Sequence, residues 1–348
     1  MRRAPAVALV CLAATLVSCS RAPQAAVRPS SGTGTGTAPS TGALFAGAQP
    51  WTADVAAAPA SERSPAVLAA LTRAGGWGNG NVLQIDFAMP VLTADASTPR
   101  VPVTGAAEYC DGGPDCDPVP AEMPVPAGAT TEGSPDLTCD AEEEDCHLLV
   151  ADTAGRRLYE VYEGTGSPEG LTVGGFFVWD LDRTYSDELR GPQCTSADAA
   201  GFPIAALTPT ADEVASGRIG HALRFILPND RMKAGVYVPP ATHAGGPESP
   251  DPDAPPYGVH FRLKPDLDTS AFTAPQRVVL TALQTYGMYL SDGGEIALTF
   301  ADDRPTTAKW ADLGIDAQSF GALTVDDFEV IDHGPEVPAT YECARVGG

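Results

Sequence analysis

The stretch Leu158-Tyr159-Glu160-Val161-Tyr162 decides the fold class of this chain. Its aromatic and β-branched residues favour a pleated strand, and successive side chains of a strand point to opposite faces. Leu158, Glu160 and Tyr162 therefore share one face of the predicted strand, while Tyr159 and Val161 share the other. The stretch predicts a β-strand that carries a carboxylate and an aromatic ring side by side.

Short runs of the same kind recur along the chain between turn residues. They lie at 82–89, 148–151, 157–162, 175–181, 222–227, 236–238, 259–263 and 296–300. Helical signals are few and lie at 64–74, 210–216 and 275–286. Gly 36 and Pro 33 in a chain of 348 residues also suit a loop-rich β protein. We expect a mainly β fold, a concanavalin-like or jelly-roll sandwich with a few short helices.

The first 18 residues are typical of a bacterial lipoprotein signal peptide. Arg2 and Arg3 precede a short apolar run, and small residues then lead to Cys19. The run is too short to span a bilayer as a mature helix. We expect lipidation of Cys19 and an extracytoplasmic protein that is anchored to the cell membrane through this lipid. The alternative is an ordinary secretory signal with a chance cysteine, which also predicts export.

The domain organisation follows from composition. Residues 19–44 contain almost no large apolar side chain, so we expect a disordered tether there. We expect one β-sandwich domain over 45–348, with an acidic, cysteine- and proline-rich insertion at 110–146. Six cysteines remain in this exported domain, an even number that predicts disulfides. The expected pairs are Cys110–Cys116, Cys139–Cys146 and Cys194–Cys343.

The charge of the chain restricts its partners. Lys and Arg number 21 against 45 Asp and Glu, which gives a formal net charge of −24. Such a field repels phosphate backbones, so nucleic acid is not an expected partner. It argues less strongly against a polyanionic substrate, because one local basic pocket could override it. Solubility or a saline habitat is the plain alternative explanation.

Several blocks of sequence follow one another between 45 and 332. They are 50–54, 158–162, 195–204 (TSADAAGFPI), 213–225 (EVASGRIGHALRF), 240–243 and 286–294 (YGMYLSDGG). Their order and length resemble a largely uncharacterised family of exported bacterial and fungal proteins. The resemblance implies a concanavalin-like or jelly-roll fold, and it places the chain among proteins often found beside carbohydrate-active modules. The insertion at 110–146 departs from the family pattern and could reshape a cleft.

No short signature of a known enzyme class is present. The chain lacks a Gly-x-Ser-x-Gly elbow, a His-Glu-x-x-His motif, a phosphate loop and a dinucleotide fingerprint, so no cofactor is expected. His221, His243 and His260 could converge on a metal ion. They include no closely spaced histidine pair, and we therefore expect no metal site.

Three residues are candidates for catalysis. Glu160 lies beside an aromatic ring on its strand face, where it could act on a glycosidic oxygen; a solvated outward side chain is the alternative. Asp198 lies in a loop of small residues and could either cap a turn or orient a catalytic partner. His221 is either a buried structural histidine or a proton carrier.

Four more residues are candidates for substrate binding. Tyr162 could serve as a platform for a sugar ring. Arg224 points away from the face of His221 on the same predicted strand and is expected to pair with an acid. His243 follows a rigid proline-rich lead-in and is expected near a surface or cleft. Asp292 is either a turn cap or an acid at the edge of a cleft.

These candidates favour an exported, membrane-tethered glycan-active protein, for example a glycoside hydrolase with two carboxylates flanking the scissile bond. The expected partner is a polysaccharide or a cell-envelope glycan. A lyase that uses His221 and a tyrosine is less favoured because the chain is so acidic. The alternative from a different class is a non-catalytic lipoprotein that binds glycan or acts as an envelope scaffold.

Overall fold

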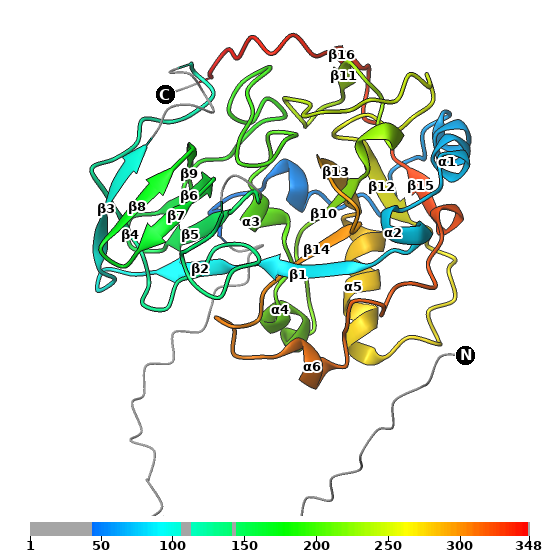
Figure 1. Ribbon diagram of the computed structural model, residues 1–348. Coiled ribbons are helices and arrows are strands. Elements are labelled where there is room, and N and C mark those ends of the chain that lie inside the picture. Colours follow the sequence, from blue (N-terminus) through cyan, green and yellow to red (C-terminus); the bar gives the residue numbers. More distant parts are fainter. Residues whose placement is uncertain (1–43, 106–112, 141–143, 347–348) are drawn as a thin grey trace, which may run out of the picture. The chain divides into compact units, whose positions relative to one another are not determined.

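A computed structural model describes residues 44–105, 113–140 and 144–346. Over these residues it contains 16 strands in four sheets and a few short helices (Figure 1). The predicted mainly β fold is therefore confirmed. The finer prediction of a jelly roll or concanavalin-like sandwich is not confirmed. Three of the four sheets contain a parallel strand pair, whereas a jelly roll is antiparallel.

The largest sheet has six strands in the order β1-β14-β10-β13-β12-β15. These strands are β1 (Ile85–Met89), β14 (Leu298–Ala301), β10 (Leu223–Leu227), β13 (Met288–Gly293), β12 (His260–Leu263) and β15 (Phe328–Val330). At its centre, β10 pairs in parallel with β13 and antiparallel with β14. Polar side chains on β10 can therefore reach residues of both neighbouring strands.

Three smaller sheets complete the β structure. One has the order β2 (Val91–Ala94), β5 (Leu148–Asp152), β6 (Arg157–Tyr162) and β9 (Gly175–Asp180). Another has the order β4 (Glu122–Pro124), β3 (Arg100–Gly105), β8 (Gly170–Val173) and β7 (Thr165–Ser167). The last pairs β11 (Val236–Tyr237) with β16 (Val337–Pro338).

The β2-β5-β6-β9 sheet separates two apolar cores. Leu158 and Trp179 on one face belong to the larger core, which also contains side chains of the six-stranded sheet. Val161 and Phe176 on the other face belong to the smaller core, together with side chains of β3, β4 and β8. The alternation predicted for residues 158–162 is therefore confirmed, and both faces of this sheet are covered.

The helices are short and lie around these sheets. They are α1 (Ser64–Arg73), α2 (Gly78–Asn81), α3 (Ile204–Leu207), α4 (Ala211–Ser216), α5 (Ala274–Thr285) and α6 (Trp310–Leu313), with 3-10 helices η2 (Pro50–Thr52), η3 (Asn229–Arg231) and η4 (Val325–Asp327). All three predicted helices are present, and each predicted strand overlaps an observed one. The capping box of α4 forms between Thr210 and Glu213.

Two of the three predicted disulfides are confirmed, Cys139–Cys146 and Cys194–Cys343. The third prediction involves Cys110, which lies outside the described residues. The predicted signal peptide, Cys19 and nearly all of the predicted tether also lie outside them. Among the helices that are described, none has the length and apolar character needed to span a membrane.

Candidate functional site

The candidate site is centred on Arg224, a buried arginine in the middle of the six-stranded sheet. Its guanidinium Nη2 donates to Asp198 Oδ1 at 3.0 Å and to Asp292 Oδ2 at 3.3 Å. On the opposite side, Nη1 donates to Thr299 Oγ1 on β14 at 3.1 Å. Nε donates to Ser291 Oγ on β13 at 3.3 Å. The parallel pairing of β10 with β13 thus brings Arg224 and Asp292 together, and the loop that carries Asp198 completes a cluster of three predicted residues.

Asp198 is the innermost acid of this cluster. Its side chain is fully buried, and its Oδ2 accepts a hydrogen bond from the Phe202 backbone N at 3.3 Å. Ser291 Oγ donates to its Oδ1. Burial raises the pKa of Asp198, although Arg224 and these hydrogen bonds oppose that rise. Both predicted roles are visible in this geometry, since Asp198 closes its own loop and also holds Arg224.

Asp292 is the acid of the cluster that meets solvent, with 25% of its side chain exposed. Its Oδ1 accepts from the Gly293 N at 2.8 Å, so it also caps the predicted turn. Its Oδ2 accepts from Arg224 and, at 3.4 Å, from the Ala199 N. Burial and the charge of Asp198 raise the pKa of Asp292 to about 7. Its carboxyl can therefore exchange a proton near neutral pH.

A second charged pair, His147 with Glu132, interacts electrostatically with Arg224 and Asp292. His147 Nδ1 is 2.6 Å from Glu132 Oε2, and His147 Nε2 is 2.9 Å from the Ala197 carbonyl. Burial alone would lower the pKa of His147, but the charge of Glu132 and its hydrogen bond raise it to about 9. His147 therefore carries a positive charge at neutral pH. The ring of Tyr162, the predicted sugar platform, lies 5.6 Å from that of His147.

Glu132 is the second carboxylate of the site with access to solvent, because 24% of its side chain is exposed. Burial alone would raise its pKa, yet the charge and hydrogen bond of His147, together with the charge of Arg224, hold the pKa of Glu132 below its usual value. The positive charge of His147 likewise lowers the pKa of Asp292, against the larger effect of burial. The positive charges of Arg224 and His147 therefore act to lower the pKa of both Glu132 and Asp292.

Sequence reasoning missed Glu132, His147 and a third residue, Asp86. Glu132 lies within the irregular insertion 110–146, where no periodicity marks a face, and His147 follows directly after it. Asp86 lies on β1, and burial, supported by the charge of Glu132, raises its pKa. The one available signal was His147 itself, a histidine that immediately precedes a strongly apolar strand.

Glu160, the first predicted catalytic residue, is fully buried and has its hydrogen-bond partners on β9 and α3. Trp179 Nε1 donates to its Oε2 at 3.0 Å, and the Ala205 N donates to its Oε1 at 2.9 Å. Burial raises the pKa of Glu160 to about 7, and the charge of Asp198 adds to this effect. Both carboxylate oxygens are occupied and shielded from solvent, an arrangement that supports the core rather than contact with a substrate.

His221, the predicted proton carrier, is also fully buried. Its Nε2 lies 3.3 Å from Glu213 Oε1, and its Nδ1 donates to the Ala222 carbonyl at 2.8 Å. Glu213 in turn accepts from the Thr210 backbone at the start of α4. His221 lies two residues before β10 rather than on the strand predicted for it. Its contacts connect this segment to the start of α4, which is the structural alternative considered from the sequence.

The other two histidines are placed differently. His243 is half-buried at the rim of the site, where its Nδ1 donates to the Ala199 carbonyl at 2.8 Å. His260 stacks on Tyr289 with ring centroids 4.0 Å apart. Across the described segments, no three-histidine cluster brings His221, His243 and His260 within metal-binding reach.

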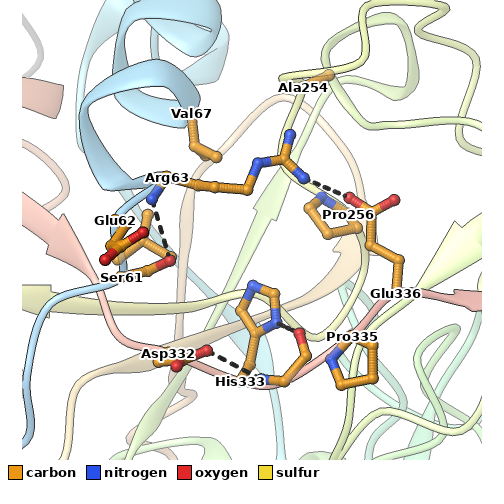
Figure 2. A pocket seen from close by; sticks show the side chains of 12 residues that line it. Ser61, Glu62, Arg63, Val67, Ala254, Pro256, Asp332, His333, Pro335 and Glu336 are labelled. Atoms are coloured by element: carbon orange, nitrogen blue, oxygen red, sulfur yellow. Dashed lines mark hydrogen bonds and ion pairs between the residues drawn. The ribbon is translucent and has the colours of Figure 1, made fainter.

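A separate cavity of about 500 Å³ lies between the start of α1 and the segment 332–336 (Figure 2). Arg63 reaches across it to Glu336 at 3.0 Å and also pairs with Asp253 at 3.0 Å. His333 projects into the cavity opposite the Arg63–Glu336 pair. None of the site residues predicted from the sequence lines this cavity.

No protein-family model, curated protein or solved structure matches this chain. The functional assignment therefore depends on the geometry around Arg224 and on the chemistry of the residues there.

Proposed function

We propose that the protein is an exported, lipid-anchored glycan-active enzyme of the glycoside hydrolase type. In this proposal Asp292 is the general acid and Glu132 is the base or charge-stabilising carboxylate. Arg224 and His147 hold the two carboxylates. Asp198 positions Arg224 and raises the pKa of Asp292.

The observation that carries the proposal is the opposite displacement of two carboxyl pKa values around Arg224. The pKa of Asp292 is raised to about 7, whereas that of Glu132 is lowered. Near neutral pH, one group can donate a proton while the other remains ionised. Pairs of carboxyl groups whose surroundings separate their pKa values in this way are typical of glycoside hydrolysis and other acid–base catalysis.

Charge and hydrogen bonding support a neutral glycan as the substrate. The net charge of −24 repels polyanions, so an uncharged ligand approaches the site more easily. The solvent-facing groups of the site are the carboxylates of Asp292 and Glu132, which can accept hydrogen bonds from sugar hydroxyl groups. The resemblance to exported proteins found beside carbohydrate-active modules agrees with this substrate class, as does the aromatic ring of Tyr162 beside His147.

The test is a hydrolysis assay of the wild type on neutral oligosaccharides of glucose, xylose, mannose and N-acetylglucosamine. We expect Asp292→Asn and Glu132→Gln each to lower kcat by about 10²–10⁴-fold, the usual contribution of acid–base groups. Asp230→Asn is the matched control, because Asp230 is an exposed acid in η3 without a role in the cluster.

The outcomes separate the two classes of function. Equal rates for Asp292→Asn and wild type would overturn the assignment of the acid. Binding of a glycan without any product would favour the non-catalytic alternative. Neither binding nor hydrolysis across the panel would overturn the glycan proposal as a whole.

A further inference from the structure

Tyr341 is a large side chain that remains open to solvent near the candidate site. It is 52% exposed, and in the described part of the chain only Val119 joins it among exposed large apolar residues. Its ring meets that of His243 edge to face, with centroids 5.2 Å apart and an interplanar angle of 73°. Whichever ring supplies the edge, at least one face of Tyr341 stays free of His243.

The backbone that carries this exposed ring is held in place by hydrogen bonds and a disulfide. Tyr341 has a φ of 60°, a left-handed conformation that is uncommon for a residue with a side chain and is strained by about 1 kcal/mol or more. Gln193 Oε1 accepts hydrogen bonds from the backbone N of Thr340 and of Tyr341, at 2.8 and 3.3 Å. Two residues further on, Cys343 is joined to Cys194 by a disulfide.

The segment after the disulfide is anchored as well. The Ala344 N donates to the Pro192 carbonyl at 3.0 Å, and the Val346 N donates to the Arg190 carbonyl at 3.0 Å. Arg345 Nη2 donates to Asp117 Oδ1 at 2.6 Å. These contacts fix the segment on both sides of Tyr341, although the side chain of Tyr341 itself packs into no core. A role in binding would explain why an exposed aromatic residue is held at this position.

One ring contact and two hydrogen bonds connect Tyr341 to the acid of the proposed site. Its ring contacts His243, whose Nδ1 donates to the Ala199 carbonyl at 2.8 Å. The N–H of the same residue, Ala199, donates to Asp292 Oδ2 at 3.4 Å. The exposed ring of Tyr341 is therefore linked, through His243 and Ala199, to the loop that positions Asp292.

We propose that Tyr341 forms an aromatic subsite that stacks against a pyranose ring of a neutral glycan extending from Asp292. This inference rests on the proposed function and adds a binding position to it. The apolar C–H face of a pyranose suits the negative face of an aromatic ring, and a ring fixed in advance loses little entropy when the ligand binds. In this proposal His243 positions the Tyr341 ring through their edge-to-face contact and has no catalytic role.

The experiment compares the KM of hexasaccharides and disaccharides from the same neutral panel. Tyr341→Asn removes the ring but keeps a residue that tolerates the left-handed backbone. We expect it to raise the hexasaccharide KM about three- to tenfold more than the disaccharide KM, with little effect on kcat. Tyr341→Phe retains the ring and should restore most of the loss.

Thermal unfolding of the same variants shows whether the C-terminal segment stays in place. Asp292→Asn, measured for hexasaccharide binding, should retain the affinity that depends on Tyr341. Equal KM ratios in wild type and Tyr341→Asn would overturn the subsite and leave the assignment of Asp292 intact. A wild type that neither binds nor cleaves any sugar of the panel would overturn both.

Discussion

Trp179 donates a hydrogen bond from its indole Nε1 to Glu160 Oε2 at 3.0 Å, across the antiparallel strands β6 and β9. Leu158 lies directly opposite Trp179 in this register, so Glu160 is its diagonal neighbour on the same sheet face. With the Ala205 N on the other oxygen, the carboxylate joins a strand, its neighbour and the start of α3. A carboxylate bonded in this way is a structural element of the core.

Replacing Glu160 should therefore affect stability. Glu160→Gln replaces one carboxylate oxygen with an NH₂ group, which is a donor. Whichever way the amide is turned, this group faces either the indole N–H of Trp179 or the Ala205 N–H, so one buried donor loses its acceptor. We expect a loss of about 1–3 kcal/mol in the free energy of unfolding. Urea denaturation measures it, and Glu188→Gln, at an exposed position, is the control. An unchanged midpoint for Glu160→Gln would contradict the structural role.

The strand alternation of residues 158–162 was predictable from sequence, because it depends only on the period of two in a strand. The partners of Glu160 were not predictable, because they are fixed by the register of β9 and by the position of α3, whose Ala205 lies 45 residues further along the chain. The same applies to Arg224. Its pairing with an acid was expected, but Asp292 could be identified only from the pairing of β10 with β13, and Asp198 only from the placement of its loop against these strands.

Arg224 should be among the most sensitive positions of the chain. Arg224→Met would leave the buried Asp198 carboxylate without its cation, and breaking such a pair costs about 3–5 kcal/mol. Arg73→Met is the control, because Arg73 pairs with Asp251 at the surface and 61% of its side chain is exposed. That exposed pair should contribute less than about 1 kcal/mol. Equal unfolding midpoints for the two variants would contradict the central role of Arg224.

The proposed lipid anchor predicts where the protein is found after cell fractionation. In a bacterial host, wild type should sediment with membranes, because acyl chains contribute about 0.8 kcal/mol per buried CH₂. Cys19→Ala removes the only proposed attachment point and should give soluble or unprocessed protein. Cys11→Ala changes the other cysteine of this region, within the apolar run, and should remain membrane-bound. Soluble wild type would instead indicate an ordinary secretory signal.

The buried charges also predict how stability changes with pH. Asp292 and Glu160 have pKa values of about 7 in the folded chain, against ordinary values of 3.8 and 4.5. Between about pH 4 and about pH 7, the unfolded chain releases these protons while the folded chain keeps them. The folded state then binds more protons than the unfolded state, so both groups make stability fall as pH rises through this window.

His147 extends this fall to higher pH. Its folded pKa of about 9 lies above the ordinary 6.5, so its contribution is complete below about pH 6.5 and is lost as pH rises through 9. Thermal unfolding at pH 5, 7 and 9 should therefore give a steadily decreasing Tm. Asp292→Asn has no carboxyl to titrate there and should show a smaller decrease between pH 5 and 7, whereas Asp230→Asn should follow wild type. Parallel curves for Asp292→Asn and wild type would mean that Asp292 is already ionised in the folded chain below neutral pH, and it would then be unable to serve as the acid of the site.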